Sequence, residues 1–580
     1  MKNLFNPIFL AGSTLFMQGT WLYAQEEHPN IIWITCEDIS PYMETYGDKV
    51  VKTPNIDRLA AEGQQFQSVY TTAGVSSPSR SCIITGMYPM SIGTQHMRTL
   101  IGNPAVSKKL GIYPYSAVIP EYVKAFPEYL RMNGYYTSNN QKTDYQFIEP
   151  VTVWDECSPA ATYQRAPKGK PFFSVFNLFI THESQLFKQS PWYKGHEDLL
   201  VKPEDVTLPP YYKDTPEARK CMARMLSNVQ LMDYQVGEII KQLKKDGVYD
   251  NAYIFFFSDH GGTMPWMKRE ILERGTHIPF IVKFPKGKNA GTVNTDLISS
   301  VDFAPTILSL AGIDIPNYIQ GQAFLGKQSS SEKRRYVFAA RDRMDECYDR
   351  VRSVRDKQFR YIYNFMPNQP KYMDVSYRRG LPMMKEMLEL HEKGELNEYQ
   401  DDWFKPTKPL EELYDVENDP DELHNLASDP AYKEKLEELR KAFRTWMNEV
   451  GDLSYMPEKE MLANWWHGES HAPLTEAPEL HKVEGGYTLS CPTIGASIGY
   501  KILKKGEKDE KINVTRKSFD MGYVIRLQPN DVQIQVGTPW NVYQKNTVLK
   551  LNPGDTLIVN AKRIGYEENI KTFTFYVSSG

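Results

Sequence analysis

The sequence predicts an α/β fold in which a mixed, mostly parallel sheet is covered by helices on both faces. Three short apolar runs, at residues 30–36, 172–179 and 252–257, each end in polar or charged side chains. Strands that are apolar throughout are typical of parallel sheets buried on both faces. Residues 216–245, between the second and third runs, carry apolar side chains at helical spacing. Strands and helices therefore alternate along the chain, as in a parallel or mixed sheet.

The N-terminal segment predicts export. Lys2 precedes an apolar stretch that runs to Ala24, the pattern of a secretory signal peptide cleaved near Ala24. The alternative, a buried first strand, fits poorly with Pro7, Gly12 and Gly19 in the same stretch. No cysteine stands at the expected cleavage point, so no stable membrane anchor is predicted. We expect a protein that is periplasmic or secreted in a bacterium.

The remaining chain is long enough for more than one hydrophobic core. After about residue 330, short strands and a helix at 432–450 indicate a smaller C-terminal α+β subdomain. From about residue 486 the sequence becomes rich in Thr, Val, Ile and Tyr, which is typical of a β-sandwich. The predicted parts are a signal peptide (1–24), an N-terminal α/β domain (25–330), the α+β subdomain (331–480) and a β-sandwich-like module (481–580).

Composition and charge exclude several classes of protein. The apolar fraction of 41% and the charged fraction of 24% are those of an ordinary soluble globular protein. A net charge of -4 gives no sign of the basic face that nucleic acid requires, so no nucleic-acid partner is expected. Six cysteines in 580 residues are too sparse for a disulfide framework, and no pair has zinc-type spacing. We expect mostly free, buried thiols.

Acidic side chains follow two of the predicted strands. Glu37 and Asp38 come directly after residues 30–36, and Asp259 and His260 follow the run at 252–257. Because ligands of α/β sheets bind at the carboxyl ends of the strands, we expect both pairs at one site. Each of these acids alone is equally consistent with a helix cap or a solvated side chain, but two pairs at two strand ends favour a common site.

Residues 76–86 carry the most informative pattern in the chain. They read Ser-Ser-Pro-Ser-Arg-Ser-Cys-Ile-Ile-Thr-Gly, with Arg80 four residues after Ser76 at the start of a predicted helix. The free N–H groups of a helix N-terminus favour an anion, and the arginine adds a fixed positive charge. On local sequence alone, a Ser/Pro turn that caps a structural helix explains the segment equally well.

At every defining position this stretch resembles the signature Cys/Ser-x-Pro-Ser-Arg-x-x-x-x-Thr-Gly of the formylglycine-dependent sulfatases, which belong to the alkaline phosphatase superfamily. The resemblance covers most of residues 28–445, including residues 53–60 and 412–426. It is closest to bacterial heparan N-sulfatase-like sulfatases. It implies an alkaline phosphatase-like fold, a catalytic N-terminal domain, and oxidation of Ser76 to formylglycine by a maturation enzyme.

The resemblance also implies a metal site. Glu37, Asp38, Asp259 and His260 match the family's metal ligands, and the modified Ser76 supplies a further oxygen. A site made mostly of oxygens suits Ca²⁺. His260 stands where many sulfatases have asparagine, and its imidazole leaves Mn²⁺ or Mg²⁺ open.

Positively charged groups and a histidine complete the implied site. Arg80 would hold the hydrated formylglycine, Lys142 and Lys268 would contact the sulfate, and His182 would protonate the departing oxygen. A lone lysine or histidine is usually an ordinary surface residue, so these assignments depend on the motifs around them. The family's Gly-Lys-x-His motif reads Gln-Lys-Thr-Asp here, and Asp144 replaces its histidine. The role of that histidine is therefore open.

The chemistry that the resemblance implies is hydrolysis in two steps. One hydroxyl of the hydrated formylglycine attacks sulfur while His182 protonates the leaving alcohol or amine, and the second hydroxyl then expels sulfate. The expected substrate is a sulfated oligosaccharide. His96 and Arg98 would line the sugar pocket and face a uronate carboxylate or a second sulfate. Residues 341–346 are a further candidate, and a solvated cluster of ion pairs explains them at least as well.

Two other functions remain open. A phosphonate or phosphate monoester hydrolase of the same superfamily is favoured by the Asp259-His260 pair, and a comparison of sulfate and phosphate esters would separate it from a sulfatase. A sulfated-glycan binding protein whose catalysis has lapsed is consistent with an unmodified Ser76. The mass of the peptide that contains Ser76 tests this second alternative.

Overall fold

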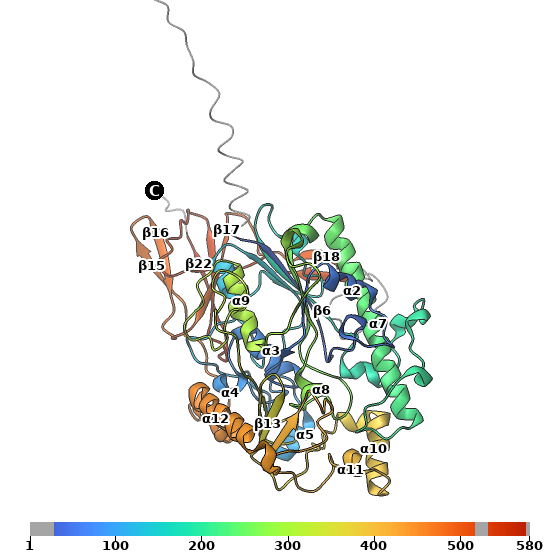
Figure 1. The fold of residues 1–580 in the computed structure, drawn as a ribbon. Coiled ribbons are helices and arrows are strands. Elements are labelled where there is room, and N and C mark those ends of the chain that lie inside the picture. Colours follow the sequence, from blue (N-terminus) through green and yellow to red (C-terminus); the bar gives the residue numbers. More distant parts are fainter. Residues whose placement is uncertain (1–27, 517–531, 576–580) are drawn as a thin grey trace, which may run out of the picture.

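The computed structural model describes residues 28–516 and 532–575 (Figure 1). The predicted signal peptide lies outside the described residues. The centre of the molecule is an eight-stranded sheet in which neighbours from β5 to β7 are parallel, β8 is antiparallel to both of its neighbours, and β9 is parallel to β2. The predicted mixed, mostly parallel sheet is therefore confirmed. In order across the sheet the strands are β5 (Glu156–Cys157), β4 (Tyr136–Asn140), β6 (Phe172–Leu178), β1 (Asn30–Cys36), β7 (Ala252–Ser258), β8 (Phe280–Lys283), β2 (Gln64–Phe66) and β9 (Thr292–Asn294).

The central strand β1 is apolar throughout because both of its faces are covered. Ile32 and Ile34 belong to one buried cluster, whereas Ile31 and Trp33 belong to another on the opposite face. On the first face lie the helices α2 (Pro54–Ala61) and α7 (Pro216–Lys245), and on the second lie α3 (Ser76–Thr85), α6 (Phe126–Met132) and α9 (Phe303–Leu310). The 30-residue helix α7 has the predicted bounds. It begins directly after Thr215, whose side chain accepts a hydrogen bond from the first turn.

A four-stranded antiparallel sheet follows the central sheet in the chain. Its strands are β11 (Val337–Arg341), β12 (Val351–Arg355), β13 (Phe359–Asn364) and β14 (Glu411–Asp415). The helix α12 (Lys433–Val450) packs on this sheet through Leu436, Leu439, Phe443 and Trp446 (Figure 1). The shorter elements of residues 28–480 are β3 (Val69–Tyr70), α4 (Pro89–Ile92), α5 (Pro104–Leu110), α8 (Glu273–Thr276), β10 (Ile298–Ser299), α10 (Pro382–Glu392), α11 (Glu398–Asp401) and α13 (Glu458–Trp465).

The C-terminal residues form additional antiparallel sheets, as the predicted fold class requires. One sheet holds four strands and two hold a pair each. In Figure 1, β15, β16, β17 and β22 lie at the upper left of the view and α12 at the lower left. Where the domains begin and end remains a prediction. The strands are β15 (Glu479–Val483), β16 (Gly486–Ser490), β17 (Ser497–Leu503), β18 (Ile512–Arg516), β19 (Val532–Val536), β20 (Asn541–Val542), β21 (Thr556–Lys562) and β22 (Asn569–Thr574).

The cysteines of the chain are free thiols. All six cysteines lie in the described residues and are free, and three of them are buried: Cys36, Cys82 and Cys221. None of the helices in the described ranges has the length and the hydropathy that a membrane crossing needs.

Candidate active site

Three parallel strands bring most of the predicted site residues to one edge of the sheet. The last residues of β1 lie beside the ends of β6 and β7, with Cys36 opposite both Leu178 and Ser258. The segments that follow these strands therefore meet. They carry Glu37 and Asp38 after β1, His182 after β6, and Asp259 and His260 after β7.

Ser76 is the first residue of α3 and lies against this cluster. The preceding Val75 is extended, with a φ of -154°, and Ser76 is 2% exposed. The Ser76 Oγ lies 3.3 Å from the His260 Nε2. One turn along α3, Arg80 donates from Nε to Asp259 Oδ2 at 2.9 Å and from Nη1 to Asn177 Oδ1 at 3.1 Å. The first turn of α3 is thus held against the ends of β6 and β7.

The carboxylates form a buried cluster that fits a divalent cation. Oxygen and nitrogen atoms of Asp38, Asp259 and His260 lie within 4.8 Å of one another, and Glu37, Asp38 and His182 form a second group that meets the same limit. Within the described chain, Glu37 Oε1 is buried and accepts no hydrogen bond. An unpaired buried carboxylate oxygen is costly, and a bound cation would remove that cost. The residues present therefore fit a divalent cation.

Glu37, Asp38 and Asp259 are each paired with one positively charged side chain. Lys142 Nζ donates to Glu37 Oε2 at 2.7 Å, Lys268 Nζ donates to Asp38 Oδ2, and Arg80 binds Asp259. Burial raises the pKa of Glu37 to about 7, although Lys142 opposes the rise. Burial would also raise the pKa of Asp259, but the charges of His260 and Arg80 outweigh it and lower this pKa to about 2. Three acidic and three basic side chains are therefore balanced at the end of the sheet where an anion would meet Ser76.

His182 lies at the mouth of the cluster, with 18% of its side chain exposed. Its ring stacks on Phe179 at 4.9 Å between centroids. The backbone N–H of Ser184 donates to Nδ1 at 3.2 Å, so in the neutral ring the proton resides on Nε2, which lies 3.9 Å from Glu37 Oε2. Burial and the neighbouring Lys268 hold the pKa of His182 well below its usual range. The imidazole is therefore neutral near pH 7 in the free protein.

His96 and Arg98 occupy different environments. His96 is 3% exposed, its Nε2 faces Glu458 Oε2 at 3.9 Å, and burial lowers its pKa to about 4. It lies inside the wall of the site. Arg98 keeps 25% of its side chain exposed and pairs with Asp345. The structure thus leaves Arg98 as the accessible one of the two.

Several residues around the site had no role assigned from the sequence. Glu183 and Arg269 form a bidentate pair at 3.0 and 2.9 Å and join the segment of His182 to the segment of Lys268. Asn177 accepts from Arg80, and Glu458 reaches the wall from α13. For Glu183 and Arg269, adjacency to His182 and Lys268 was the available signal. For Asn177 and Glu458 the sequence carries no local pattern.

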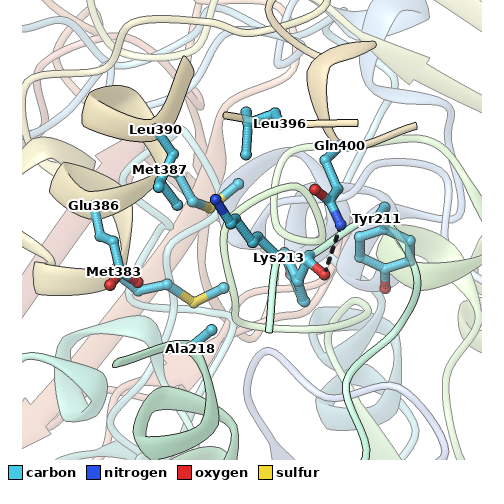
Figure 2. Close-up of a pocket in the computed structure, with 10 residues that line it drawn as sticks. Tyr211, Lys213, Ala218, Met383, Glu386, Met387, Leu390, Leu396 and Gln400 are labelled. Atoms are coloured by element: carbon cyan, nitrogen blue, oxygen red, sulfur yellow. Dashed lines mark hydrogen bonds between the residues drawn. The ribbon is translucent and has the colours of Figure 1, made fainter. Parts of the chain in front are cut away.

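A hollow lies between α7 and α10, away from these residues. Figure 2 shows Lys213, Met383 and Met387 around it, and its volume is about 10 Å³. That volume suits no more than one water molecule. None of the predicted site residues lines it, so we do not assign it to the substrate.

The fold and this strand-end site define a hydrolase of the alkaline phosphatase-like class. The sequence model of the Sulfatase family matches residues 29–313, and the model described as N-sulphoglucosamine sulphohydrolase, C-terminal, matches residues 261–400. An ulvan-active sulfatase of Formosa agariphila is 40% identical over 93% of this chain and 90% of its own length. The chain belongs to the sulfatase family and is a sulfuric ester hydrolase.

Solved structures agree on the fold. A putative sulfatase of Bacteroides fragilis superposes with a TM-score of 0.54 at 18% identity, over 75% of this chain and 98% of the other. A phosphonate monoester hydrolase of Agrobacterium radiobacter superposes with a TM-score of 0.53 at 16% identity, over 80% of this chain and 100% of the other. Because both activities occur on this fold, the fold alone does not distinguish them.

Proposed function

We propose that the chain releases inorganic sulfate from sulfate ester or sulfamate groups of a sulfated carbohydrate, with a nucleophile made from Ser76. The observation that carries the proposal is the position of Ser76 at the start of α3, with its Oγ 3.3 Å from His260 and beside a buried acidic cluster. The relative that is 40% identical is named an ulvan-active sulfatase, and the second matching family model is named for N-sulphoglucosamine. Both names support a carbohydrate substrate.

In this proposal Ser76 is oxidised to formylglycine, which supplies a hydroxyl nucleophile once hydrated. Glu37, Asp38, Asp259 and His260 would hold the cation, for which we propose Ca²⁺, with Mn²⁺ or Mg²⁺ as alternatives. When bound, a divalent cation supplies the charge that makes a hydroxyl at position 76 acidic near neutral pH. The one imidazole among the ligands is the reason that the alternatives stay open.

Cationic side chains of this chain would bind the sulfate. Lys142 and Lys268 bring two buried ammonium groups to the cluster, and Arg80 brings a guanidinium from the first turn of α3. Fixed donors at such a site stabilise charge on the sulfuryl oxygens better than water does. Arg80 is also anchored by Asp259, so it would orient position 76 without moving during the reaction.

His182 would give the proton to the departing oxygen from Nε2. Because its pKa is low in the free protein, the negative charge of a bound sulfate must raise that pKa before the ring acts as a general acid. Asp144 is the second residue that we consider for proton transfer. It accepts a hydrogen bond from Ser77 Oγ at 2.6 Å and lies 3.6 Å from Lys142 Nζ.

We also propose that the protein is exported and that a formylglycine-generating enzyme acts on Ser76 during maturation. Export follows from the pattern of residues 1–24. A periplasmic or secreted location would give the enzyme access to extracellular polysaccharide fragments.

Two measurements on the purified protein test this function. The first is sulfate release from sulfated sugars compared with phosphate release from matched phosphate and phosphonate esters. The second is the mass of the peptide that contains Ser76, which loses two hydrogens on oxidation. Sulfate release with the oxidised peptide is the expected result. Preferential release of phosphate would favour the phosphonate hydrolase alternative, and an unmodified Ser76 without turnover would favour a glycan-binding protein.

A further inference from the structure

We infer that Arg98, held by Tyr377 and Asp345, forms a second anion subsite that binds a carboxylate or a further sulfate on the sugar next to the one that loses its sulfate. The inference rests on the proposed function, because it concerns the same bound oligosaccharide. It narrows the substrate class to acidic oligosaccharides with a negative group on the neighbouring ring.

The subsite lies close to the nucleophile. Met97, the residue before Arg98, packs in one buried apolar cluster with Val75, the residue before Ser76, and Tyr377 packs against the same cluster. Burial raises the pKa of Tyr377 to about 12, so its hydroxyl stays protonated as a donor. Tyr377 thus contacts Arg98 and packs against the apolar cluster that holds Val75.

Arg98 offers a free edge to a ligand. Its Nε lies 2.8 Å from Asp345 Oδ1, and its guanidinium carbon lies 4.7 Å from the centre of the Tyr377 ring. Among the residues that the structure describes, Arg98 Nε is buried and makes no hydrogen bond of good geometry, and no acceptor is hydrogen-bonded to its two terminal nitrogens. A quarter of the side chain, 25%, is exposed. A guanidinium edge of two parallel N–H groups matches a carboxylate or a sulfate.

Backbone strain marks the same two residues. Arg98 has a φ of 58° and Asp345 a φ of 48°, in the left-handed region that residues other than glycine seldom adopt. Strain of this kind persists only where the surroundings impose it, and it is concentrated at functional sites. An ion pair with a purely structural role has no need of two strained residues or of an exposed guanidinium edge.

The buried side chain of Arg343 fixes the backbone on both sides of this pair. Arg343 donates from Nη1 to the carbonyl oxygens of Met97 at 3.0 Å and Asp345 at 2.6 Å. Its Nε and Nη2 bind Glu458 of α13 at 2.6 and 2.7 Å. The backbones that carry both halves of the Arg98–Asp345 pair are therefore fixed by one arginine, whose partner comes from the C-terminal part of the chain.

The test compares three substrates in the mature enzyme and in Arg98→Gln. The substrates are a sulfated disaccharide with a neighbouring uronate, the same disaccharide with that carboxyl group reduced to an alcohol, and an aryl sulfate. Loss of a charge-assisted bidentate contact should lower kcat/KM for the acidic disaccharide about 10–100-fold, mainly through KM. The loss should be at most a few-fold for the other two. A disaccharide whose neighbouring ring carries a second sulfate tells which anion the subsite prefers.

Two controls keep the result interpretable. Arg335→Gln removes the same charge from a side chain that is 71% exposed and paired with Glu438 on α12, so it should leave all three substrates unaffected. Arg98→Lys keeps the charge without the planar edge and should show an intermediate loss on the acidic disaccharide. Thermal melting shows whether each variant is folded.

Binding measured without turnover separates this inference from the proposed function. Calorimetry of the acidic disaccharide with Ser76→Ala protein, with and without Arg98→Gln, should show weaker binding when Arg98 is absent. Equal losses for all three substrates, or unchanged binding of the acidic disaccharide, would overturn the subsite. Absence of sulfate release from every substrate, with binding still dependent on Arg98, would instead contradict the proposed function.

Discussion

Ser76 is surrounded by buried acidic side chains, each paired with a basic one. These pairs determine how a single substitution changes the stability and the activity of the protein. Glu37 is paired with Lys142, Asp38 with Lys268, and Asp259 with Arg80. Removal of one member of a buried pair leaves the other charge without compensation, at a typical cost of about 3–5 kcal/mol. A substitution in these pairs therefore changes stability as well as chemistry. Ser76 belongs to none of the pairs, so it is the residue at which chemistry is tested most cleanly.

Ser76→Ala should abolish sulfate release and leave the fold intact, because only the side chain that becomes the nucleophile is lost. Among the described residues its Oγ makes one hydrogen bond, of 3.3 Å, with His260, so the melting temperature should stay near that of the parent protein. Turnover of a sulfated sugar together with a thermal melt checks this prediction. Retained sulfate release would contradict the assignment of the nucleophile.

Asp38→Ala and Asp259→Ala should both lose the bound divalent metal, and a chelator should suppress the activity of the parent enzyme. Each of these carboxylates faces His260 within the same buried group. Elemental analysis of the purified variants measures the metal content. Ser76→Ala is the matched control, because it removes one expected ligand and keeps the three carboxylates and the imidazole. One equivalent of metal in both aspartate variants would show that the ligands are elsewhere.

His182→Ala should slow a sulfated sugar much more than an activated aryl sulfate. A sugar alcohol is a poor leaving group and needs a proton in the transition state, and general-acid help is typically worth about 10²–10⁴-fold. Lys268→Ala would act on the sulfuryl oxygens and should slow both substrates by similar factors. Rate constants for the two substrates in the two variants give the comparison. Equal losses in the histidine variant would assign it to positioning, and Asp144 would become the next candidate for the proton.

At the scale of elements, the strands and helices that carry the catalytic half could be predicted from sequence. β1 and α7 have the predicted bounds, since a strand buried on both faces and a helix with one apolar stripe leave clear patterns. The motif at Ser76 and the acids after β1 and β7 were found because each follows an element directly. Arg343 lies in the stretch 341–346, which the sequence offered as a candidate, but Tyr377 and Glu458 could not be found in this way. Tyr377 reaches the site from a loop and Glu458 from α13, and tertiary packing alone brings them to it.

Glu458→Gln tests how α13 supports the wall of the site. Burial alone would raise the pKa of Glu458, but His96 and Arg343 oppose it and bring this pKa to about 2, below the ordinary value of a glutamate. A depressed carboxyl pKa stabilises the fold above the unfolded pKa, and the benefit disappears as the pH falls toward the folded value. We therefore expect the variant to lose about 3 kcal/mol of unfolding free energy at about pH 7 and less at about pH 3.

Denaturant titrations of the parent protein and the variant at these two pH values measure the difference. Glu460→Gln is the control, because Glu460 lies on the same helix and is exposed. A constant difference between Glu458→Gln and the parent protein at both pH values would show that the carboxylate charge is not what stabilises α13.

For the whole molecule, the question is whether the C-terminal sheets are a separable module or part of one packed body. Glu128 of α6 is 1% exposed and lies at the junction. Ser497 of β17 donates to it at 2.8 Å, and Lys124 reaches both Glu128 at 2.8 Å and Ser497 at 2.7 Å. Among the described contacts across this junction, none involves a predicted site residue. The sheets therefore act on α6 and its surroundings, and not directly on the substrate.

Gly499→Val should loosen this junction. A Cβ at Gly499 would lie 2.7 Å from Val151 Cγ2, a separation that real side chains do not show, and valine adds two further methyl groups. Overpacking of this kind typically costs about 1–3 kcal/mol. Gly537→Val is the matched control, since a Cβ there meets nothing within 4 Å. If the sheets and the catalytic part form one body, Gly499→Val should lower the melting temperature of the whole protein and speed its proteolysis between the two parts, whereas Gly537→Val should do neither. Equal melting curves for both variants would mean that the C-terminal sheets are docked too loosely to stabilise the catalytic part.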